Sequence, residues 1–292
     1  MSVPALEAPS VGAALRRGAD RLRRAGVEAA ARDARLLLAE ASGQDRARLI
    51  AFPERTLSAR ELAAYEAFLT RRARREPVSR ILGRREFWSL DFAVTADTLD
   101  PRPETEVLVE AVLARLPAPG TDLRVLDLGC GSGCILLALL TALGGAQGLG
   151  IDASAAAVEV ARGNAEALGL ERRAAFRVGD WAAGLGGTWQ AIVSNPPYIV
   201  ESEIEDLAPE VRGYDPHPAL SGGPDGLDAY RVLLPQAVRL LAPEGLLALE
   251  FGAGQADAVQ RLAEAAGLRV EDRIRDLARR ERCLIATPFS RG

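Results

Sequence analysis

Apolar residues recur at helical spacing through the first third of the chain. They share one side of an arginine-rich stretch at 15–25, and a second apolar face begins after Asp33 with three leucines. Ser58 precedes further apolar positions at helical spacing and has Glu61 three residues later, which is the capping-box start of a helix. Residues 11–85 are therefore predicted to be helical, within a small N-terminal domain.

The pattern changes at residue 86. β-prone and aromatic residues partly alternate from Phe87 to Val94. Pro101 and Pro103 then close the stretch, because proline cannot continue a strand ladder. We expect a β-hairpin linker over residues 86–104. It would join the helical domain, residues 1–85, to a larger domain at residues 105–292.

From residue 105 onward, predicted strands alternate with predicted helices. The strand candidates are short apolar runs at 124–128, 148–152, 175–179, 191–194 and 246–251. Helical patterns lie at 105–117, 133–143, 154–168 and 226–242. This alternation is typical of an α/β fold whose mostly parallel sheet is covered on both faces. Two more strands, at 269–274 and 282–286, are expected at the sheet edge, which makes seven.

Charge divides the chain, although the overall composition of 48% apolar and 26% charged residues is ordinary for a globular protein. Residues 1–90 carry 18 arginines and 11 acidic residues, a net +7, whereas residues 91–292 carry 18 and 29, a net −11. Phosphate binding needs a positive track, so the second part argues against a nucleic-acid partner. The cluster of Arg71, Arg72, Arg74 and Arg75 has two readings, an anion contact or a solvated helix end that complements its dipole.

Cysteine and histidine are too sparse for several kinds of site. Cys130, Cys134 and Cys283 do not make a disulfide framework, and no further Cys or His clusters near the first two to complete a zinc site. His217 is the only histidine and is expected in a loop. We therefore predict no metal and a reduced, cytoplasmic setting. The uncharged run 134–151 is interrupted by glycines, which favours a helix followed by a strand over a membrane span, and no signal peptide is visible.

The first candidate for ligand chemistry is Gly129-Cys130-Gly131-Ser132-Gly133, directly after a predicted strand. Glycines permit a sharp turn and the close approach of a ligand, and the helix N-terminus that follows favours acceptors or negative charge. The dinucleotide fingerprint requires G-x-G-x-x-G, but here the third glycine comes one residue early and Cys134 takes its place. A tight turn without a ligand is the alternative.

Acidic residues follow the next two predicted strands. Asp152 stands where a carboxylate can take both hydroxyls of a ribose, or else cap the next helix. Asp180 and Trp181 follow the third strand. There a carboxylate can bond an adenine edge and an aromatic ring can pack on its face, whereas core packing is the other reading of Trp181.

The most specific motif is Asn195-Pro196-Pro197-Tyr198, after the fourth strand. The two prolines keep the backbone stiff and extended, which would hold the Asn195 side-chain oxygen and the Pro196 carbonyl as two acceptors. Two acceptors at this spacing suit a planar NH₂ group, and Tyr198 offers it a flat face. The alternative is a rigid structural turn.

Together these motifs resemble class I S-adenosylmethionine-dependent N-methyltransferases. The resemblance extends over nearly the whole chain to the bacterial peptide chain release factor glutamine N5-methyltransferase family. It is carried by Asp33-Ala34, Gly83-x-x-Glu86-Phe87, Pro101-Arg102-Pro103-Glu104-Thr105-Glu106, Ala219-Leu220-x-Gly222-Gly223-x-Asp225-Gly226-Leu227 and Glu250-x-Gly252-x-x-Gln255. The chain departs from the family pattern at Asp215, where many members have glutamate, and at Arg279, where glycine is expected.

The resemblance implies a Rossmann-like fold and methylation of the glutamine amide in the Gly-Gly-Gln loop of class 1 release factors. S-adenosylmethionine would be held by the glycine turn at 129–133, Asp152, Asp180, Trp181 and Asn195. The glutamine would be held by Asn195, Pro196, Pro197 and Tyr198, and the helical domain would help dock the release factor. Acceptors on the amide N–H groups would stabilise the charge that develops on nitrogen, and the proton would leave to water without a dedicated base.

Three other functions stay open on the sequence. An adenine or guanine amino-group methyltransferase uses the same Asn-Pro-Pro-Tyr logic on nucleic acid. A glutamine methyltransferase of a ribosomal protein is a closer alternative. A cofactor-binding regulatory module without turnover would leave Asn-Pro-Pro-Tyr unexplained.

Overall fold

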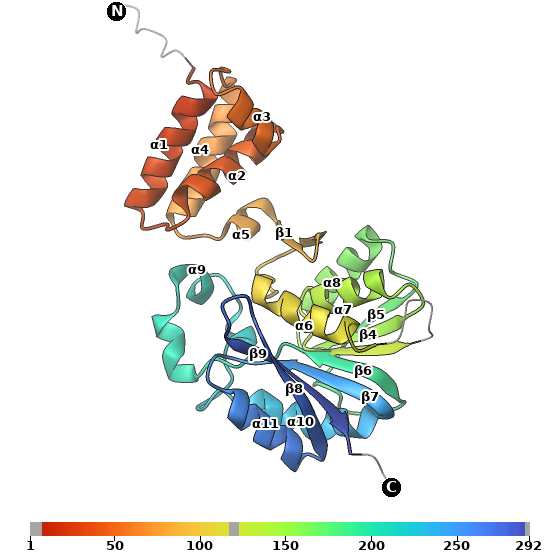
Figure 1. The fold of residues 1–292 in the computed structure, drawn as a ribbon. Coiled ribbons are helices and arrows are strands. Elements are labelled where there is room, and N and C mark those ends of the chain that lie inside the picture. The colour runs from red at the N-terminus through yellow and green to blue at the C-terminus, as the bar shows by residue number, and fades with distance from the viewer. Residues whose placement is uncertain (1–7, 117–122, 290–292) are drawn as a thin grey trace, which may run out of the picture. The chain divides into compact units, whose positions relative to one another are not determined.

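The computed structural model describes residues 8–116 and 123–289 and divides into two compact units (Figure 1). The helical unit consists of residues 1–83 and 208–214, and the sheet unit of residues 84–207 and 215–292. In this division the hairpin that we expected as a linker belongs to the sheet unit. The short segment 208–214, which lies far along the chain, belongs to the helical unit, and the sequence pattern did not indicate this.

The helical unit confirms the helices predicted from the apolar spacing. Its helices are α1 (Val11–Arg24), α2 (Ala30–Ser42), α3 (Arg46–Ala51), α4 (Ala59–Ala73), α5 (Val78–Leu82) and α9 (Pro209–Arg212). The predicted capping box begins α4: the Ser58 hydroxyl accepts from the Glu61 N–H at 3.2 Å, and the Glu61 carboxylate accepts from the Ser58 N–H at 2.7 Å. Leu22, Leu37 and Tyr65 are among the side chains buried in the core of this unit.

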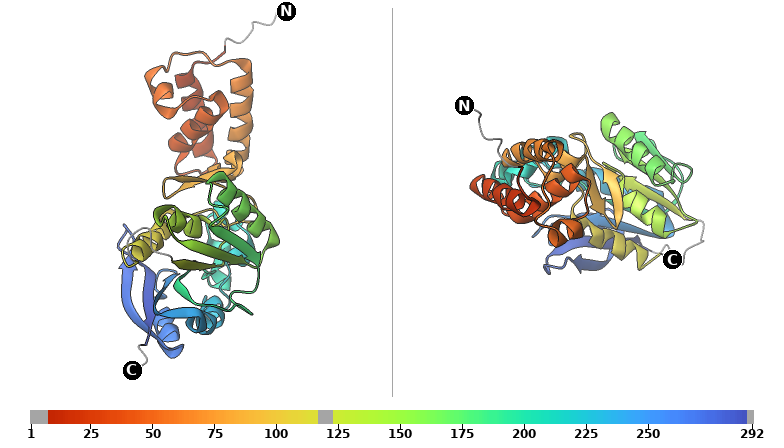
Figure 2. Two further views of the ribbon diagram at one scale, coloured as in Figure 1. Left: turned by 90° about the vertical axis from the view of Figure 1, so that its right-hand side faces the viewer. Right: turned by 90° about the horizontal axis from the view of Figure 1, so that it is seen from above.

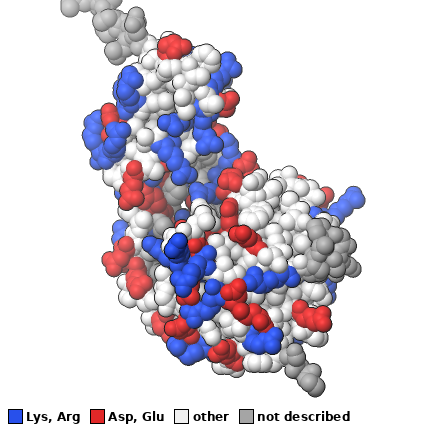
Figure 3. Space-filling model, viewed as in Figure 1, with Lys and Arg blue, Asp and Glu red and all other residues white. Residues whose placement is uncertain are grey.

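The arginine cluster at the end of α4 pairs with carboxylates of this chain. Arg72 is buried and donates to Asp33 at 2.8 Å and to Glu210 at 2.9 Å. Arg75 donates to both oxygens of Glu210 at 2.7 Å. These pairs fasten the segment 208–214 to α4. Other arginines are spread over the face of the helical unit drawn in Figure 3, whereas basic and acidic groups alternate on the sheet unit.

The sheet unit contains the predicted seven-stranded, mostly parallel sheet. Its strands are β3 (Arg124–Leu128), β4 (Gln147–Asp152), β5 (Ala174–Val178), β6 (Trp189–Ser194), β7 (Leu241–Glu250), β8 (Leu268–Arg275) and β9 (Glu281–Pro288). Their order is β5-β4-β3-β6-β7-β9-β8. Only β9 runs antiparallel to its neighbours, β7 and β8. The last two strands lie at one edge, as expected.

Helices cover both faces of this sheet (Figures 1 and 2). One face packs against α6 (Glu106–Leu113), α7 (Cys134–Ala142) and α8 (Ala155–Ala167), and the other against α10 (Asp228–Leu240) and α11 (Ala256–Ala265). Neighbouring strand residues alternate between the two cores: Val125 packs on the first and Leu126 on the second. Four of these helices, α6, α7, α8 and α10, agree with the predicted patterns. The last residue of the pattern predicted at 105–117, residue 117, lies outside the described residues. The short, alanine-rich helix α11 was not predicted.

The uncharged run 134–151 folds as predicted, into α7 and then β4 with a turn between them. Within the described ranges, no helix is both long enough and apolar enough to cross a membrane.

The predicted hairpin is formed by β1 (Arg84–Phe87) and β2 (Leu90–Ala93), which pair antiparallel. Its two turn residues, Trp88 and Ser89, both have positive φ, 54° and 59°, without being glycine. Carboxylates support this turn: Glu106 accepts from the Trp88 N–H at 2.8 Å, and Glu86 accepts from the Ser89 N–H at 2.7 Å. The hairpin is followed by a short 3-10 turn, η1 (Pro103–Thr105). Two more such turns, η2 (Glu201–Asp206) and η3 (His217–Ala219), lie after β6.

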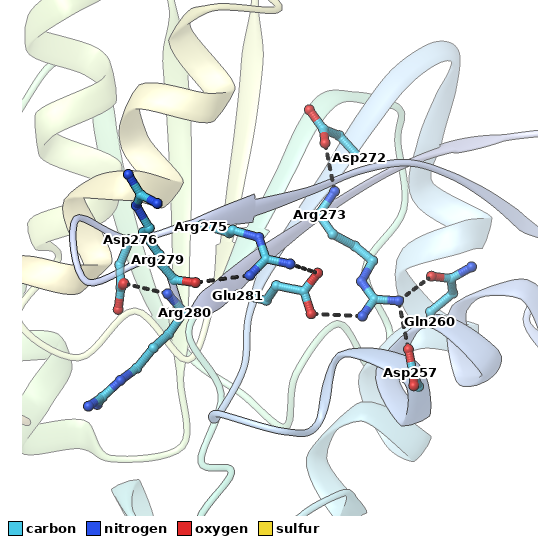
Figure 4. Close-up of polar contacts among 9 residues, drawn as sticks. All are labelled: Asp257, Gln260, Asp272, Arg273, Arg275, Asp276, Arg279, Arg280 and Glu281. Atoms are coloured by element: carbon cyan, nitrogen blue, oxygen red, sulfur yellow. Dashed lines mark hydrogen bonds and ion pairs between the residues drawn. The ribbon is translucent and has the colours of Figure 1, made fainter.

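The turn between β8 and β9 keeps a left-handed residue where the family pattern has glycine (Figure 4). Arg279 adopts a φ of 62°, which costs a non-glycine residue about 1 kcal/mol. Asp276 closes the turn, because its N–H donates to the Arg280 carbonyl at 2.8 Å and its carboxylate accepts from the Arg280 N–H at 2.9 Å. Arg275 also donates to the Arg279 carbonyl at 3.0 Å. The departure therefore leaves the turn closed.

Candidate functional site

A cavity of about 340 Å³ opens in the sheet unit at the carboxyl ends of its central strands. Its wall is formed by the turn after β3, the end of β4 and the segments that follow β5 and β6, together with parts of the loops 96–102 and 216–219. The chain connects β3 to β4 on one side and reaches β6 on the other, so the strand order reverses here. Ligands of open α/β sheets bind at such a point.

The predicted glycine turn forms one wall of the cavity. Gly129, Gly131 and Gly133 all have positive φ, between 53° and 78°. The N–H groups of Gly129 and of the next residue donate to the Ile151 carbonyl on β4, at 2.8 and 3.0 Å. Residues 129–132 line the cavity and Gly133 does not. A Cβ on Gly133 would lie 3.1 Å from the Phe176 ring, so this glycine serves helix packing.

Asp152 joins the glycine turn to the end of β4. One carboxylate oxygen accepts from the Gly131 N–H at 2.8 Å, and the other accepts from the Ser154 N–H at 2.9 Å. The cap of α8 is Ser154, whose hydroxyl accepts from the Ala157 N–H at 3.2 Å, so the capping reading of Asp152 does not apply. Each Asp152 oxygen keeps a lone pair for a hydroxyl in the cavity.

Asp180 and Trp181 lie on the cavity wall after β5. Asp180 is exposed, and Trp181 is half-buried with a φ of 50°. The Trp181 ring would lie 3.5 Å from a Cβ on Gly129, and it also packs against the core beside α10. Trp181 therefore packs against the core and also lines the cavity, and its contact with an adenine face stays a prediction.

The Asn-Pro-Pro-Tyr segment begins where β6 meets β3. The Ser194 hydroxyl donates to the Leu128 carbonyl at 2.6 Å and fixes the end of the strand. Asn195 and Pro197 line the cavity, whereas Pro196 is buried and Tyr198 stands behind the wall, half-buried. The Asn195 amide donates to the Thr105 hydroxyl at 3.2 Å. Within residues 8–116 and 123–289, nothing donates to its side-chain oxygen.

Tyr198 is held by the residues of the last sequence motifs. The Gln255 amide donates to the Tyr198 carbonyl at 2.9 Å and to the Gly226 carbonyl at 3.3 Å, and its oxygen accepts from the Gly252 N–H at 2.9 Å. A Cβ on Gly226 would lie 2.5 Å from the Tyr198 carbonyl oxygen. The Tyr198 hydroxyl donates to Glu250 at 3.4 Å. These distant motif residues thus fix the backbone and ring of Tyr198.

Close relatives carry one name. A protein of Rhodospirillum rubrum named release factor glutamine methyltransferase is 55% identical over 282 residues, 97% of this chain and 86% of the relative. Proteins of the same name from Caulobacter vibrioides and Moorella thermoacetica are 48% and 45% identical over 91% of this chain, and 92% and 94% of the relatives. This chain belongs to the release factor glutamine methyltransferase family.

Two family models agree with this membership, and a solved structure shares the fold of the sheet unit. Residues 13–83 match the PrmC N-terminal domain, and residues 87–210 match the methyltransferase small domain. A methyltransferase from Pyrococcus furiosus shares the fold with a TM-score of 0.51 and 19% identity, covering 68% of this chain and 88% of that one. The protein is a methyltransferase with the Rossmann-like fold of its class, as the motifs predicted.

Two carboxyl groups are fully buried at the site. Asp127 precedes the glycine turn, and Glu250 ends β7 behind Tyr198. Burial raises the pKa of each to about 7, opposed at Asp127 by the Leu136 backbone N–H and at Glu250 by the Thr105 hydroxyl and Arg282. Burial also raises the pKa of the Cys130 thiol in the cavity wall. This cysteine is therefore a neutral thiol near pH 7 and not a nucleophile.

Several cavity residues belong to motifs that carry the family resemblance, but the sequence predicted no role for them. Arg102 and Thr105 come from the Pro-Arg-Pro-Glu-Thr-Glu motif and line the wall. Asp215 stands where many members of the family have glutamate. It pairs with Arg102 and accepts from the Asp100 N–H at 3.3 Å. It ties the loops before η1 and η3 together. His217, which we expected in a loop, is exposed and begins the 3-10 turn η3. It does not line the cavity, although its proline neighbours do.

Proposed function

We propose that this methyltransferase moves a methyl group from S-adenosylmethionine to the side-chain amide nitrogen of the glutamine in the Gly-Gly-Gln loop of class 1 peptide chain release factors. The proposal depends mainly on one observation, the hydrogen-bond acceptor of Asn195 that the described residues leave free at the cavity. Its side-chain oxygen lacks a donor in the described chain, and the residue lines a cavity shared with the glycine turn and Asp152. Relatives named for release factor glutamine methylation, at 45–55% identity, support the substrate.

The cofactor end of the cavity fits S-adenosylmethionine. Gly131 has a positive φ, and a Cβ there would meet nothing within 4 Å, so a ligand can approach its backbone. Asp152 has spare acceptor capacity for ribose hydroxyls. Asp180 and Trp181 line the same cavity, and we propose that they contact the edge and the face of the adenine. The bound cofactor supplies a methyl group on a sulfonium sulfur, which an amide nitrogen can accept.

The other end of the cavity would hold the glutamine amide. The Asn195 side-chain oxygen would accept one of its N–H bonds, with Pro197 beside it on the wall. For the second N–H bond we keep the Pro196 carbonyl as the acceptor, although Pro196 is buried and does not line the cavity. Tyr198 supports the segment from behind. An amide nitrogen is a weak nucleophile that gains positive charge as it is methylated. Acceptors fixed in advance stabilise that charge in the transition state, where stabilisation raises the rate.

The proposal assigns docking of the release factor to the helical unit. Residues 1–90, most of which belong to that unit, carry 18 arginines against 11 acidic residues, whereas the chain as a whole has a net charge of −4. Because the proposed substrate works in translation and the three cysteines are free thiols, we expect the reaction in the cytoplasm. The reaction proposed here involves neither a nucleic acid nor a membrane nor a metal ion.

The test is a methyl-transfer assay with two matched release factors, one with Gly-Gly-Gln and one with Gly-Gly-Ala. The protein is incubated with labelled S-adenosylmethionine, and the label is mapped by mass spectrometry. We expect label on the glutamine amide of the first factor alone. Label on neither factor, with cofactor binding intact, would contradict the proposal and direct attention to ribosomal-protein or nucleic-acid substrates.

A further inference from the structure

The orientation of the Asn195 amide is decisive, because only its oxygen can accept an N–H from a substrate amide. The two ends of an asparagine amide have the same shape, so its hydrogen-bond partners decide which end faces the cavity. Asn195 has one such partner in the described chain, the Thr105 hydroxyl, 3.2 Å from its nitrogen. As long as the Thr105 hydroxyl accepts from the Asn195 NH₂ group, the Asn195 oxygen faces the substrate. A group that keeps Thr105 as the acceptor therefore also fixes the orientation of the amide.

Thr105 is buried, and its hydroxyl has one proton to place. Since Asn195 occupies a lone pair of that oxygen, the proton must go to another acceptor. The acceptor beside it is the Glu250 carboxyl, whose pKa the Thr105 hydroxyl lowers as a donor, although the contact falls short of full hydrogen-bond geometry. Glu250 also accepts from the Tyr198 hydroxyl at 3.4 Å, and its second oxygen has no partner in full hydrogen-bond geometry within the described residues.

An ionised carboxylate accepts hydrogen bonds and cannot donate them. It forces Thr105 to donate, which leaves the Thr105 oxygen free to accept only from the Asn195 NH₂. A protonated Glu250 can donate to Thr105 instead, and the Thr105 proton can then point to Asn195 and favour the flipped amide. We propose that Glu250 is a positioning residue that acts through Thr105 to keep the Asn195 oxygen toward the substrate, and that it does so in its ionised form.

This inference rests on the proposed function of Asn195 and gives it a pH dependence. The titratable groups that face Glu250 are Arg282, Glu104, Tyr198, Tyr230, Cys134 and Cys283. Burial raises the pKa of both tyrosines and both thiols, so these four are neutral near pH 7. Arg282 and Glu104 are then the charged neighbours. Because burial brings Glu250 itself to a pKa of about 7, its ionisation falls within the working range.

The direct test uses the fact that the chain has only two asparagines, Asn164 and Asn195. Full-length protein labelled with ¹⁵N in the asparagine side chains gives two amide signals, and Asn195→Ala identifies which is which. We expect the Asn195 signal to shift with a midpoint near pH 7 and to stop titrating in Glu250→Gln. Asn164 is the internal control, because its amide is held at both ends by the Ala93 backbone. An Asn195 signal that does not titrate, or that titrates equally in Glu250→Gln, overturns the proposal whether or not a release factor is methylated.

The kinetic test compares Thr105→Ser, which keeps the hydroxyl, with Thr105→Val, which keeps the shape. We expect Thr105→Val and Glu250→Gln to lower kcat by about 10- to 100-fold at pH 8 with S-adenosylmethionine affinity unchanged, because the amide is no longer held in one orientation. Both should also lose the acid limb of the wild-type rate profile near pH 7. Thr105→Ser should restore both features.

Tyr230→Phe is the matched control. It removes a buried hydrogen bond of 2.8 Å to the Glu250 backbone carbonyl and leaves the carboxyl group in place. It should keep the acid limb. A wild-type acid limb in Glu250→Gln, or a wild-type kcat in Thr105→Val, would contradict the relay. If Glu250→Gln does not fold, the Thr105 pair decides, since neither variant changes a buried charge. A wild-type protein that methylates no release factor would instead refute the proposed function.

Discussion

The two halves of the cavity are stabilised in different ways. The glycine turn after β3 is held by its sequence neighbourhood: its N–H groups donate to Ile151 and Asp152, at the end of the next strand. The segment Asn195–Tyr198 is held by Thr105, Glu250 and Gln255, which lie 90, 52 and 57 residues away along the chain. One half is therefore encoded locally, and the other is assembled by the fold.

This difference predicts two kinds of mutational effect. A change in the glycine turn alters the packing of a βα unit, so it should lower the stability of the protein and its affinity for the cofactor. A change in the Asn195 segment alters an acceptor with few partners of its own, so it should lower the rate of methyl transfer. The four predictions that follow test this separation, beginning with the largest effect.

Asn195→Ala should lower methyl transfer by about 100- to 1,000-fold, the cost of removing one fixed polar group from a transition state. Thermal stability should change little, because the Asn195 side chain makes a single hydrogen bond to the residues that the structure describes. Asn164→Ala is the converse control, since it removes the three hydrogen bonds of a buried side chain to the backbone of Ala93 and Ser132. It should cost about 2–3 kcal/mol of stability. Initial rates and melting curves of both variants check this, and a wild-type rate for Asn195→Ala would refute its role.

Both halves keep a buried carboxyl group, and this predicts a pH effect on stability. The folded-state pKa values of Asp127 and Glu250 are raised to about 7 by burial, above their values in the unfolded chain. The native state thus binds more protons between about pH 4 and pH 7, and the free energy of unfolding falls as pH rises through that window. Asp127→Asn should flatten this fall by about 2 kcal/mol, as measured by urea unfolding at pH 5 and pH 8. An unchanged slope would show that Asp127 is not responsible.

Two glycines of the same turn should respond differently to alanine. Gly133→Ala combines a φ of 78° with a Cβ 3.1 Å from Phe176, so it should destabilise the protein by about 2 kcal/mol. Gly131→Ala meets open space and should cost about 1 kcal/mol, but its methyl group would enter the cavity and weaken cofactor binding. Melting curves and calorimetry separate the two effects. Equal losses of affinity in both variants would contradict the assignment of Gly133 to packing.

The same contrast explains what the sequence could predict. Strand–turn–helix spacing identified β3, the glycine turn and Asp152, because hydrophobic periodicity and glycine chemistry are local signals. The capping box at Ser58 and the seven strands were predictable for the same reason. Asn195 was singled out by its prolines. Its partner Thr105, and Glu250, which accepts from Tyr198, were quoted only as members of motifs, without a role. No local pattern states that η1, β6 and β7 meet.

The remaining differences also arise from tertiary contacts. The helix α11 was missed because its buried face consists of Ala256, Val259 and Ala263, a weak apolar stripe. Segment 208–214 joins the helical unit through Glu210, whose partners Arg72 and Arg75 lie more than 130 residues earlier. The hairpin turn at Trp88 and Ser89 lacks the glycine that usually marks such turns, since carboxylates of Glu86 and Glu106 hold its N–H groups instead.

The smallest predicted effect tests whether the local half of the cavity binds the cofactor. Asp152→Ala removes the acceptors of the Gly131 and Ser154 N–H groups and the proposed acceptors of the ribose hydroxyls. S-adenosylmethionine affinity should fall by about 10-fold, the value of one good hydrogen-bonding partner. The turnover rate at saturating cofactor should change less, because Asn195 belongs to the other half. Calorimetry on Asp152→Ala and on Glu159→Ala, an exposed acid of α8, compares the loss of a cavity acid with the loss of a surface acid. Unchanged affinity in Asp152→Ala would remove the ribose role and leave Asp152 only its structural bonds to the turn.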